Sequence, residues 1–145
     1  MDRRHLHYAA QPAPRYTSYP AATHFQPLPA ETHAAWLGAL DSSAAVSLYL
    51  HIPYCREICL YCACHTFAAR RQEVIDGYVD ALIAEIDLVG GLSAARRVRE
   101  IHWGGGTPNI LSPADFDRIM DAVRARFDLS GLHEHAVEID PRLLT

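Results

Sequence analysis

The fold of this chain is set by the stretch "AVSLYLHIPYCREICLYC", residues 45–62, which joins an apolar segment to a run of cysteines. In its first eight residues, aliphatic side chains alternate with Ser47, Tyr49 and His51. This period of two predicts a β-strand over residues 45–52 with one apolar and one more polar face. The cysteines therefore lie at the carboxyl end of a predicted strand.

Two further strands and a well-marked helix follow the cysteines. "RVREIHW", residues 97–103, and "HAVEIDP", residues 135–141, have the composition of strands. Between them, residues 112–127 carry apolar side chains at helical spacing, with Ser112 as the N-cap and Pro113 at the first helical position. Strands that alternate with helices predict parallel βαβ units.

The segments before the second strand are less regular. Residues 1–29 hold five of the nine prolines and no apolar period, which predicts an irregular arm. "ETHAAWLGALD", residues 31–41, predicts a short helix. Apolar residues at helical spacing over about 70–88 predict a long helix, which we expect to end at Gly90 and Gly91.

Composition excludes several classes of function. The chain has 145 residues and a net charge of -4 without a basic block, which argues against nucleic acid as a partner. No apolar run reaches the roughly 20 residues needed to span a bilayer, and the start lacks the apolar segment of a signal peptide. We therefore expect a cytoplasmic protein with neither a membrane nor a nucleic acid as partner.

The predicted sheet has fewer strands than an α/β fold with parallel βαβ units normally contains. Three parallel strands with helices on one side leave the other face and the last edge uncovered, whereas parallel sheets are normally covered on both faces. We therefore expect a fragment of a larger barrel. Chemistry in such folds gathers at the carboxyl ends of the strands, which here carry the cysteines, the run "GGGTP" and Glu138.

The cysteines Cys55, Cys59, Cys62 and Cys64 are separated by three, two and one residues. These gaps are too short for useful disulfide loops, and a reducing compartment would keep the thiols free. The spacing Cys-x3-Cys-x2-Cys can supply three thiolates to a 4Fe-4S cluster and leave one iron open to substrate. A four-cysteine zinc site that includes Cys64 and a four-cysteine electron-carrying cluster remain as alternatives.

Three other features of the sequence have both a possible functional role and a purely structural explanation. "GGGTP", residues 104–108, offers bare backbone that a ligand can approach closely, or forms a tight turn. Glu138 needs a partner, which is a ligand's amine or hydroxyl group or an Arg. Tyr49 and His51 share one face of the first strand, as ligand contacts or as core residues with satisfied hydrogen bonds.

Five stretches together resemble a known family. In order, "HIPYCREICLYC", "HWGGGTP" and "EIDPR" resemble the radical S-adenosylmethionine (SAM) superfamily. "PRYTSYP", residues 14–20, and "CLYCACH" are similar to its oxygen-independent coproporphyrinogen III oxidases, or dehydrogenases. The resemblance implies an α/β fold, the N-terminal part of a TIM-like partial (β/α)6 barrel truncated after about three strands. Residues 1–29 would be a Pro-rich arm, and residues 30–145 the first portion of the barrel domain.

The resemblance also implies roles for individual residues. Cys55, Cys59 and Cys62 match the ligands of the 4Fe-4S cluster, and Cys64 matches a cysteine that is not a ligand. Six further residues match positions that contact S-adenosylmethionine, namely Tyr49, Tyr61, Gly105, Gly106, Thr107 and Glu138. In that set, the two glycines and Thr107 match the motif that holds the methionine portion. Asn109 stands where the family often has Thr, and it touches no proposed ligand.

The implied reaction is radical decarboxylation. A 5'-deoxyadenosyl radical would abstract hydrogen from a propionate side chain of coproporphyrinogen III. The loss of carbon dioxide and one electron would then leave a vinyl group, and the product would be protoporphyrinogen IX in haem biosynthesis. The implied partners are this substrate and a low-potential electron donor of the flavodoxin or ferredoxin type. Full-length members of the family would be monomers, whereas this chain alone is expected to have little or no activity.

Two other functions remain open. The haem chaperones of the same superfamily resemble the cysteine loop but usually lack the "RYTSYP" arm and the fourth cysteine, both of which are present here. A zinc-binding interaction module would use the same thiols without radical chemistry.

Overall fold

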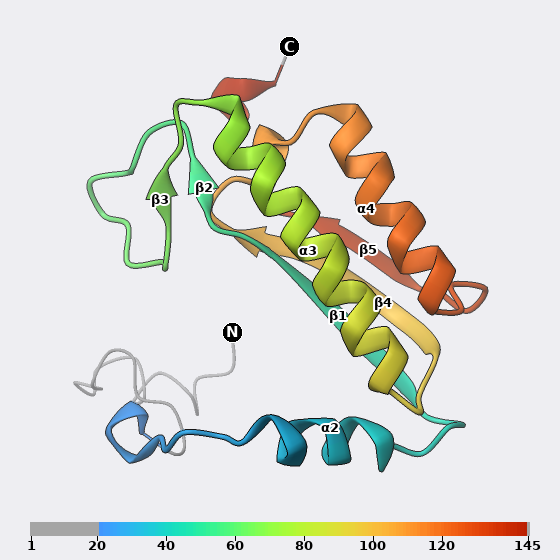
Figure 1. Cartoon of the computed structure of the whole chain (residues 1–145). Helices are drawn as coiled ribbons and strands as arrows, with labels where there is room; N and C mark the ends of the chain where they lie inside the picture. Colours follow the sequence, from blue (N-terminus) through green and yellow to red (C-terminus); the bar gives the residue numbers. More distant parts are fainter. Residues whose placement is uncertain (1–20, 145) are drawn as a thin grey trace, which may run out of the picture.

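A computed structural model describes residues 21–144 of the chain (Figure 1). Its centre is a sheet of three parallel strands in the order β1-β4-β5. These strands are β1 (Ala45–Ile52), β4 (Arg97–Gly105) and β5 (Glu134–Val137). Helix α3 (Gln72–Leu92) lies between β1 and β4 in the chain, and α4 (Pro113–Arg126) lies between β4 and β5. The predicted α/β class with parallel βαβ units is confirmed.

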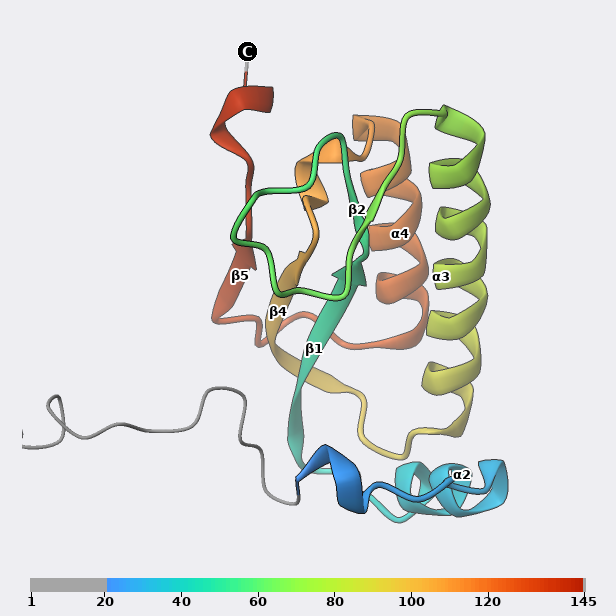
Figure 2. The same cartoon turned by 90° about the vertical axis from the view of Figure 1, so that its left-hand side faces the viewer.

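Both long helices cover the same face of the sheet (Figure 2). Leu50 and Ile52 of β1 and Ile101 and Trp103 of β4 are buried in the core that these helices complete. On the opposite face, Tyr49 is 58% exposed. The predicted faces of the first strand are therefore confirmed, and among residues 21–144 only one face of the sheet carries helices.

Shorter elements connect and flank this unit. They are η2 (Ala22–His24), α2 (Ala30–Gly38), β2 (Tyr54–Cys55), β3 (Phe67–Ala68), η3 (Pro108–Ile110) and η4 (Pro141–Leu143). Strands β2 and β3 pair in parallel and bracket the cysteine loop, with Tyr54 opposite Phe67 and Cys55 opposite Ala68. This small pair was not predicted, because two-residue strands leave no periodic pattern in a sequence.

The prediction that the long helix ends at Gly90 and Gly91 is wrong, because α3 continues through both residues to Leu92. Gly90 is buried against α4, where a Cβ atom would lie 2.6 Å from the Cβ of Arg126. Its missing side chain thus allows two helices to approach closely. The helix ends instead at Leu92 and is capped by Ser93, whose backbone N–H donates to the carbonyl oxygen of Val89 at 2.9 Å.

The start of α4 follows the prediction. The Ser112 side chain accepts a hydrogen bond from the backbone N–H of Asp115 at 3.1 Å, and Pro113 is the first helical residue. The apolar stripe of α4, which includes Ile119 and Val123, is buried in the core.

The third strand is shorter than predicted. Strand β5 ends at Val137, although the Glu138 N–H still donates to the carbonyl oxygen of Trp103 at 2.9 Å. Beyond it, the Asp140 N–H donates to the side chain of Asn109 at 2.9 Å, and its carboxylate caps η4. The backbone thus leaves the sheet because side chains, rather than a neighbouring strand, bind its polar groups.

Part of the predicted N-terminal arm lies outside the described residues, including the stretch "PRYTSYP" at residues 14–20. The boundary between an arm over 1–29 and a barrel portion over 30–145 stays a prediction. Among the described helices, none combines the length and apolar character that crossing a membrane requires.

Candidate cofactor site

The ends of the three strands meet around one cavity of about 890 Å³. The cysteine loop follows β1, the glycine run ends β4, and Glu138 follows β5, all at the same end of the sheet (Figure 2). Of the residues predicted for the site, eight line this cavity: Cys55, Cys59, Cys62, Tyr61, Gly105, Gly106, Thr107 and Glu138. Tyr49 does not line this cavity, but its exposed side chain lies close to Gly104, as does the carboxylate of Glu138.

The cysteine thiols share this cavity without converging on one point. All four thiols are free, with Cys55 buried in β2, Cys59 half-buried and both Cys62 and Cys64 exposed. Within residues 21–144, no three His, Cys, Asp or Glu side chains are arranged to hold a metal ion. The donors nevertheless fit an iron–sulfur cluster, because three thiols with the required spacing line one cavity.

The two exposed thiols differ in their electrostatics. The pKa of Cys62 is lowered, first by its hydrogen bond with the Thr66 hydroxyl and then by one with the backbone of Cys64. The pKa of Cys64 is raised, first by the negative charge of Cys62. Of this pair, Cys62 is therefore the thiol that ionises more readily.

The glycine run is held by hydrogen bonds to the protein itself. The Gly106 N–H donates to the carbonyl oxygen of Ile52 at 2.8 Å, and the Thr107 N–H donates to that of Tyr54 at 2.9 Å. The Gly105 N–H donates to a carboxylate oxygen of Glu138 at 3.2 Å. These three N–H groups therefore already have acceptors within the protein, so the prediction that this run binds a ligand stays a prediction.

Gly105 and Gly106 lie where neighbouring protein atoms leave no space for a side chain. A Cβ atom on Gly106 would lie 2.7 Å from the carbonyl oxygen of Tyr54 and 2.8 Å from that of Ile52. Gly105 has a φ of +108°, and a Cβ atom there would lie 2.5 Å from the ring of His51. Both positions therefore require glycine so that the end of β4 can pack against the start of the cysteine loop.

The side chains of Glu138 and Tyr49 both lie close to Gly104. A Cβ atom on Gly104 would lie 2.6 Å from the Tyr49 hydroxyl and 3.0 Å from the carboxylate carbon of Glu138. The pKa of Tyr49 is raised, first by desolvation of its hydroxyl and then by the negative charge of Glu138. Over residues 21–144, no Arg forms an ion pair with Glu138. Its exposed carboxylate can therefore accept hydrogen bonds from a ligand.

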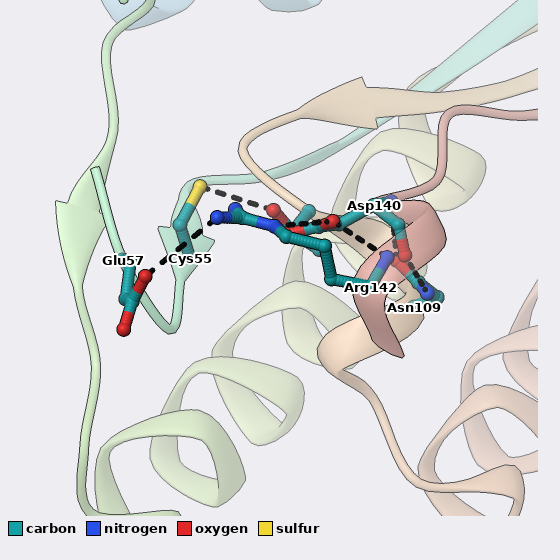
Figure 3. A network of polar contacts seen from close by, with 6 residues as sticks. Cys55, Glu57, Asn109, Asp140 and Arg142 are labelled. Atoms are coloured by element: carbon teal, nitrogen blue, oxygen red, sulfur yellow. Dashed lines mark hydrogen bonds and ion pairs between the residues drawn. The ribbon is translucent and has the colours of Figure 1, made fainter. Parts of the chain in front are cut away.

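A polar network at the edge of the cavity was missed in the sequence (Figure 3). Asn109 donates to the Asp140 carbonyl oxygen at 3.1 Å and accepts from its N–H at 2.9 Å. Arg142 lies 2.7 Å from the Asp140 carboxylate and 3.6 Å from that of Glu57 on the cysteine loop. Hydrogen bonds from Arg142 hold the pKa of Asp140 below its usual value. The motif "EIDPR" contains Asp140 and Arg142, but no feature of the sequence predicts their link to Asn109.

Known proteins are similar to this chain in sequence and in fold. Residues 49–145 match the family model of the radical SAM superfamily. The oxygen-independent coproporphyrinogen III oxidase of Bradyrhizobium diazoefficiens is 49% identical over 140 residues, which are 95% of this chain and 31% of that relative. The protein of the same name from Escherichia coli K12 is 40% identical over 129 residues, which are 89% of this chain and 28% of that relative.

A solved structure agrees with the fold. The coproporphyrinogen III oxidase of Escherichia coli, a radical SAM enzyme, has a TM-score of 0.80 to this chain at 34% sequence identity. The match covers 97% of this chain and 31% of that chain. The predicted fold class, an N-terminal part of the radical SAM barrel, is confirmed. The chain spans about 31% of the length of the first relative named above.

Proposed function

This chain belongs to the radical SAM superfamily, and on that premise we propose that it is part of an oxygen-independent coproporphyrinogen III oxidase. The proposed reaction is the oxidative decarboxylation of coproporphyrinogen III propionates to vinyl groups, which gives protoporphyrinogen IX. The relatives named for this activity support the choice of substrate. Since the chain spans about 31% of such a relative, turnover by this chain alone is expected to be little or none.

Three thiols of the cysteine loop are proposed to hold the cofactor. Cys55, Cys59 and Cys62 would bind a 4Fe-4S cluster, and Cys64 would remain outside the ligand set. When bound and reduced, such a cluster supplies the electron that cleaves S-adenosylmethionine and so begins the radical reaction. The buried position of Cys55 keeps that ligand away from water.

The glycine run, Glu138 and two tyrosines are proposed to bind S-adenosylmethionine. Glu138 presents a carboxylate without an Arg partner in the described part of the chain, which suits the ammonium group of the methionine portion. Gly105, Gly106 and Thr107 would hold that portion at the end of β4, while Tyr49 and Tyr61 would contact the rest of the cofactor. Tyr61 is 89% exposed and therefore accessible to such a ligand.

The observation that carries this proposal is the convergence of three strand ends on one cavity, which brings the cysteine loop to the glycine run and Glu138. The test is anaerobic reconstitution of the chain with iron and sulfide. We expect about four irons per chain, as a 4Fe-4S cluster requires. The electron paramagnetic resonance (EPR) signal of the reduced protein should change when S-adenosylmethionine is added. Zinc without iron would contradict the proposal, and haem binding without porphyrinogen binding would favour the chaperone function.

Glu138→Gln is expected to weaken S-adenosylmethionine binding about tenfold to 100-fold. The amide keeps an oxygen that can accept from the Gly105 N–H but loses the charge that an ammonium group requires, and a hydrogen bond to a charged group contributes about 1.5–3 kcal/mol. Isothermal titration calorimetry on the reconstituted protein measures the change. Glu134→Gln is the matched control, because Glu134 lies on β5, four residues before Glu138, but pairs with His102. Equal affinities in the two variants would refute this role.

The other partners follow from the proposed reaction. A low-potential donor of the flavodoxin or ferredoxin type would deliver the electron, and the whole enzyme would act as a monomer in the cytoplasm. No nucleic acid or membrane is proposed as a partner.

A further inference from the structure

The Thr107 hydroxyl donates a hydrogen bond to the sulfur of Cys55 at 3.1 Å. Both residues are buried, with 6% of Thr107 and 8% of Cys55 exposed. Polar side chains with so little exposure are few in the described part of the chain. A buried hydroxyl without an acceptor costs free energy, so its hydrogen bond to sulfur has a structural reason as well as chemical consequences.

The backbone fixes both partners of this hydrogen bond. The Thr107 N–H donates to the carbonyl oxygen of Tyr54, and the Thr107 carbonyl oxygen accepts from Ile110, each at 2.9 Å. The Cys55 carbonyl oxygen accepts from the Ala69 N–H at 2.9 Å. The hydroxyl and the sulfur are thus held together by strand pairing and turn geometry before any metal binds.

A second cysteine provides a contrast. The Cys62 sulfur lies 3.6 Å from the hydroxyl of Thr66, in an exposed position where either atom can be the donor. Water can replace that hydroxyl, whereas it has little access to Cys55. Of these two threonine contacts to proposed ligands, only that of Thr107 is short and buried.

We propose that Thr107 is a positioning residue that holds the Cys55 sulfur for cluster ligation and raises the reduction potential of the bound cluster. This inference rests on the proposed function. Hydrogen bonds to the sulfurs are among the factors that set the potential of an iron–sulfur cluster. A donor stabilises the reduced cluster more than the oxidised one, because the reduced state carries more negative charge on its sulfurs. The role is additional to any contact of Thr107 with S-adenosylmethionine.

The test compares Thr107→Val with Thr107→Ser in the chain reconstituted with iron and sulfide, without S-adenosylmethionine. Valine keeps the branched shape and removes the hydroxyl, whereas serine keeps the hydroxyl. We expect a more negative midpoint potential for Thr107→Val and a nearly unchanged one for Thr107→Ser, measured by redox titration of the reduced-cluster EPR signal. Thr66→Val is the matched control, with a smaller shift because its contact is exposed and longer.

The outcomes separate this inference from the proposed function. A wild-type chain that binds zinc and no cluster overturns both. A wild-type cluster whose potential and iron content are the same in Thr107→Val overturns the inference alone. A folded Thr107→Val chain that takes up less iron than Thr107→Ser supports it, because the hydroxyl is then needed for ligation. If valine prevents folding, Thr107→Ala removes the hydroxyl with less bulk, and the same comparison decides.

Discussion

Replacing Cys55, Cys59 or Cys62 with serine is expected to reduce the iron content of the reconstituted chain to nearly zero. Each of these residues is proposed to supply one thiolate to the cluster, and an alcohol is a much poorer ligand for iron in such clusters. Iron and sulfide analysis, with the EPR signal of the reduced protein, measures the loss. Far-ultraviolet circular dichroism shows whether the fold is retained.

Cys64→Ser is the matched control for these variants. It removes a thiol from the same exposed loop, but Cys64 is not proposed as a ligand. The variant should therefore bind the same amount of iron as the wild type. Loss of the cluster in Cys64→Ser, or its retention in any of the other three, would contradict the proposed ligand set.

Alanine at Gly106 is expected to lower the free energy of unfolding by about 3 kcal/mol, at the upper end of the usual cost of overpacking. The added Cβ atom would lie 2.7–2.8 Å from backbone atoms of Ile52 and Tyr54. Backbone at the end of β1 cannot rotate away as a flexible side chain can. Urea denaturation of the metal-free, reduced chain measures the change.

Gly77→Ala in helix α3 controls for the effect of alanine itself. Nothing lies within 4 Å of a Cβ atom at this position, and Gly77 is in the interior of the helix. Alanine there should stabilise the chain by about 0.5–1 kcal/mol, because it favours the helix over the unfolded state. If Gly106→Ala is as stable as the wild type, the close approach at Gly106 is not required.

The elements with strong local patterns could be predicted well. The strand over residues 45–52 has the bounds of β1, because alternation with a period of two is visible in a sequence. The N-cap at Ser112 was equally clear, since capping depends on neighbouring residues. The predicted end of the long helix was wrong because glycine at position 90 serves packing against α4 rather than termination.

The candidate site was predictable in its residue types but only partly in its contacts. Motif and position in the sequence point to the thiols, the glycine run and Glu138, and the structure places them around one cavity. For Asn109 the sequence predicts only that it touches no proposed ligand, whereas in the structure its side chain makes two hydrogen bonds to the backbone of Asp140. Such a contact joins residues 31 positions apart, which no local pattern reveals.

From the amino-acid sequence alone came the α/β class, the order of the elements and the thiols available to a metal, because these follow from periodicity and side-chain chemistry. Tertiary structure was needed to show that the N–H groups of Gly106 and Thr107 are already bound and that the Thr107 hydroxyl meets the Cys55 sulfur. The physical reason is distance in the chain. Thr107 and Cys55 are 52 positions apart, and only the parallel pairing of β1 with β4 brings them together.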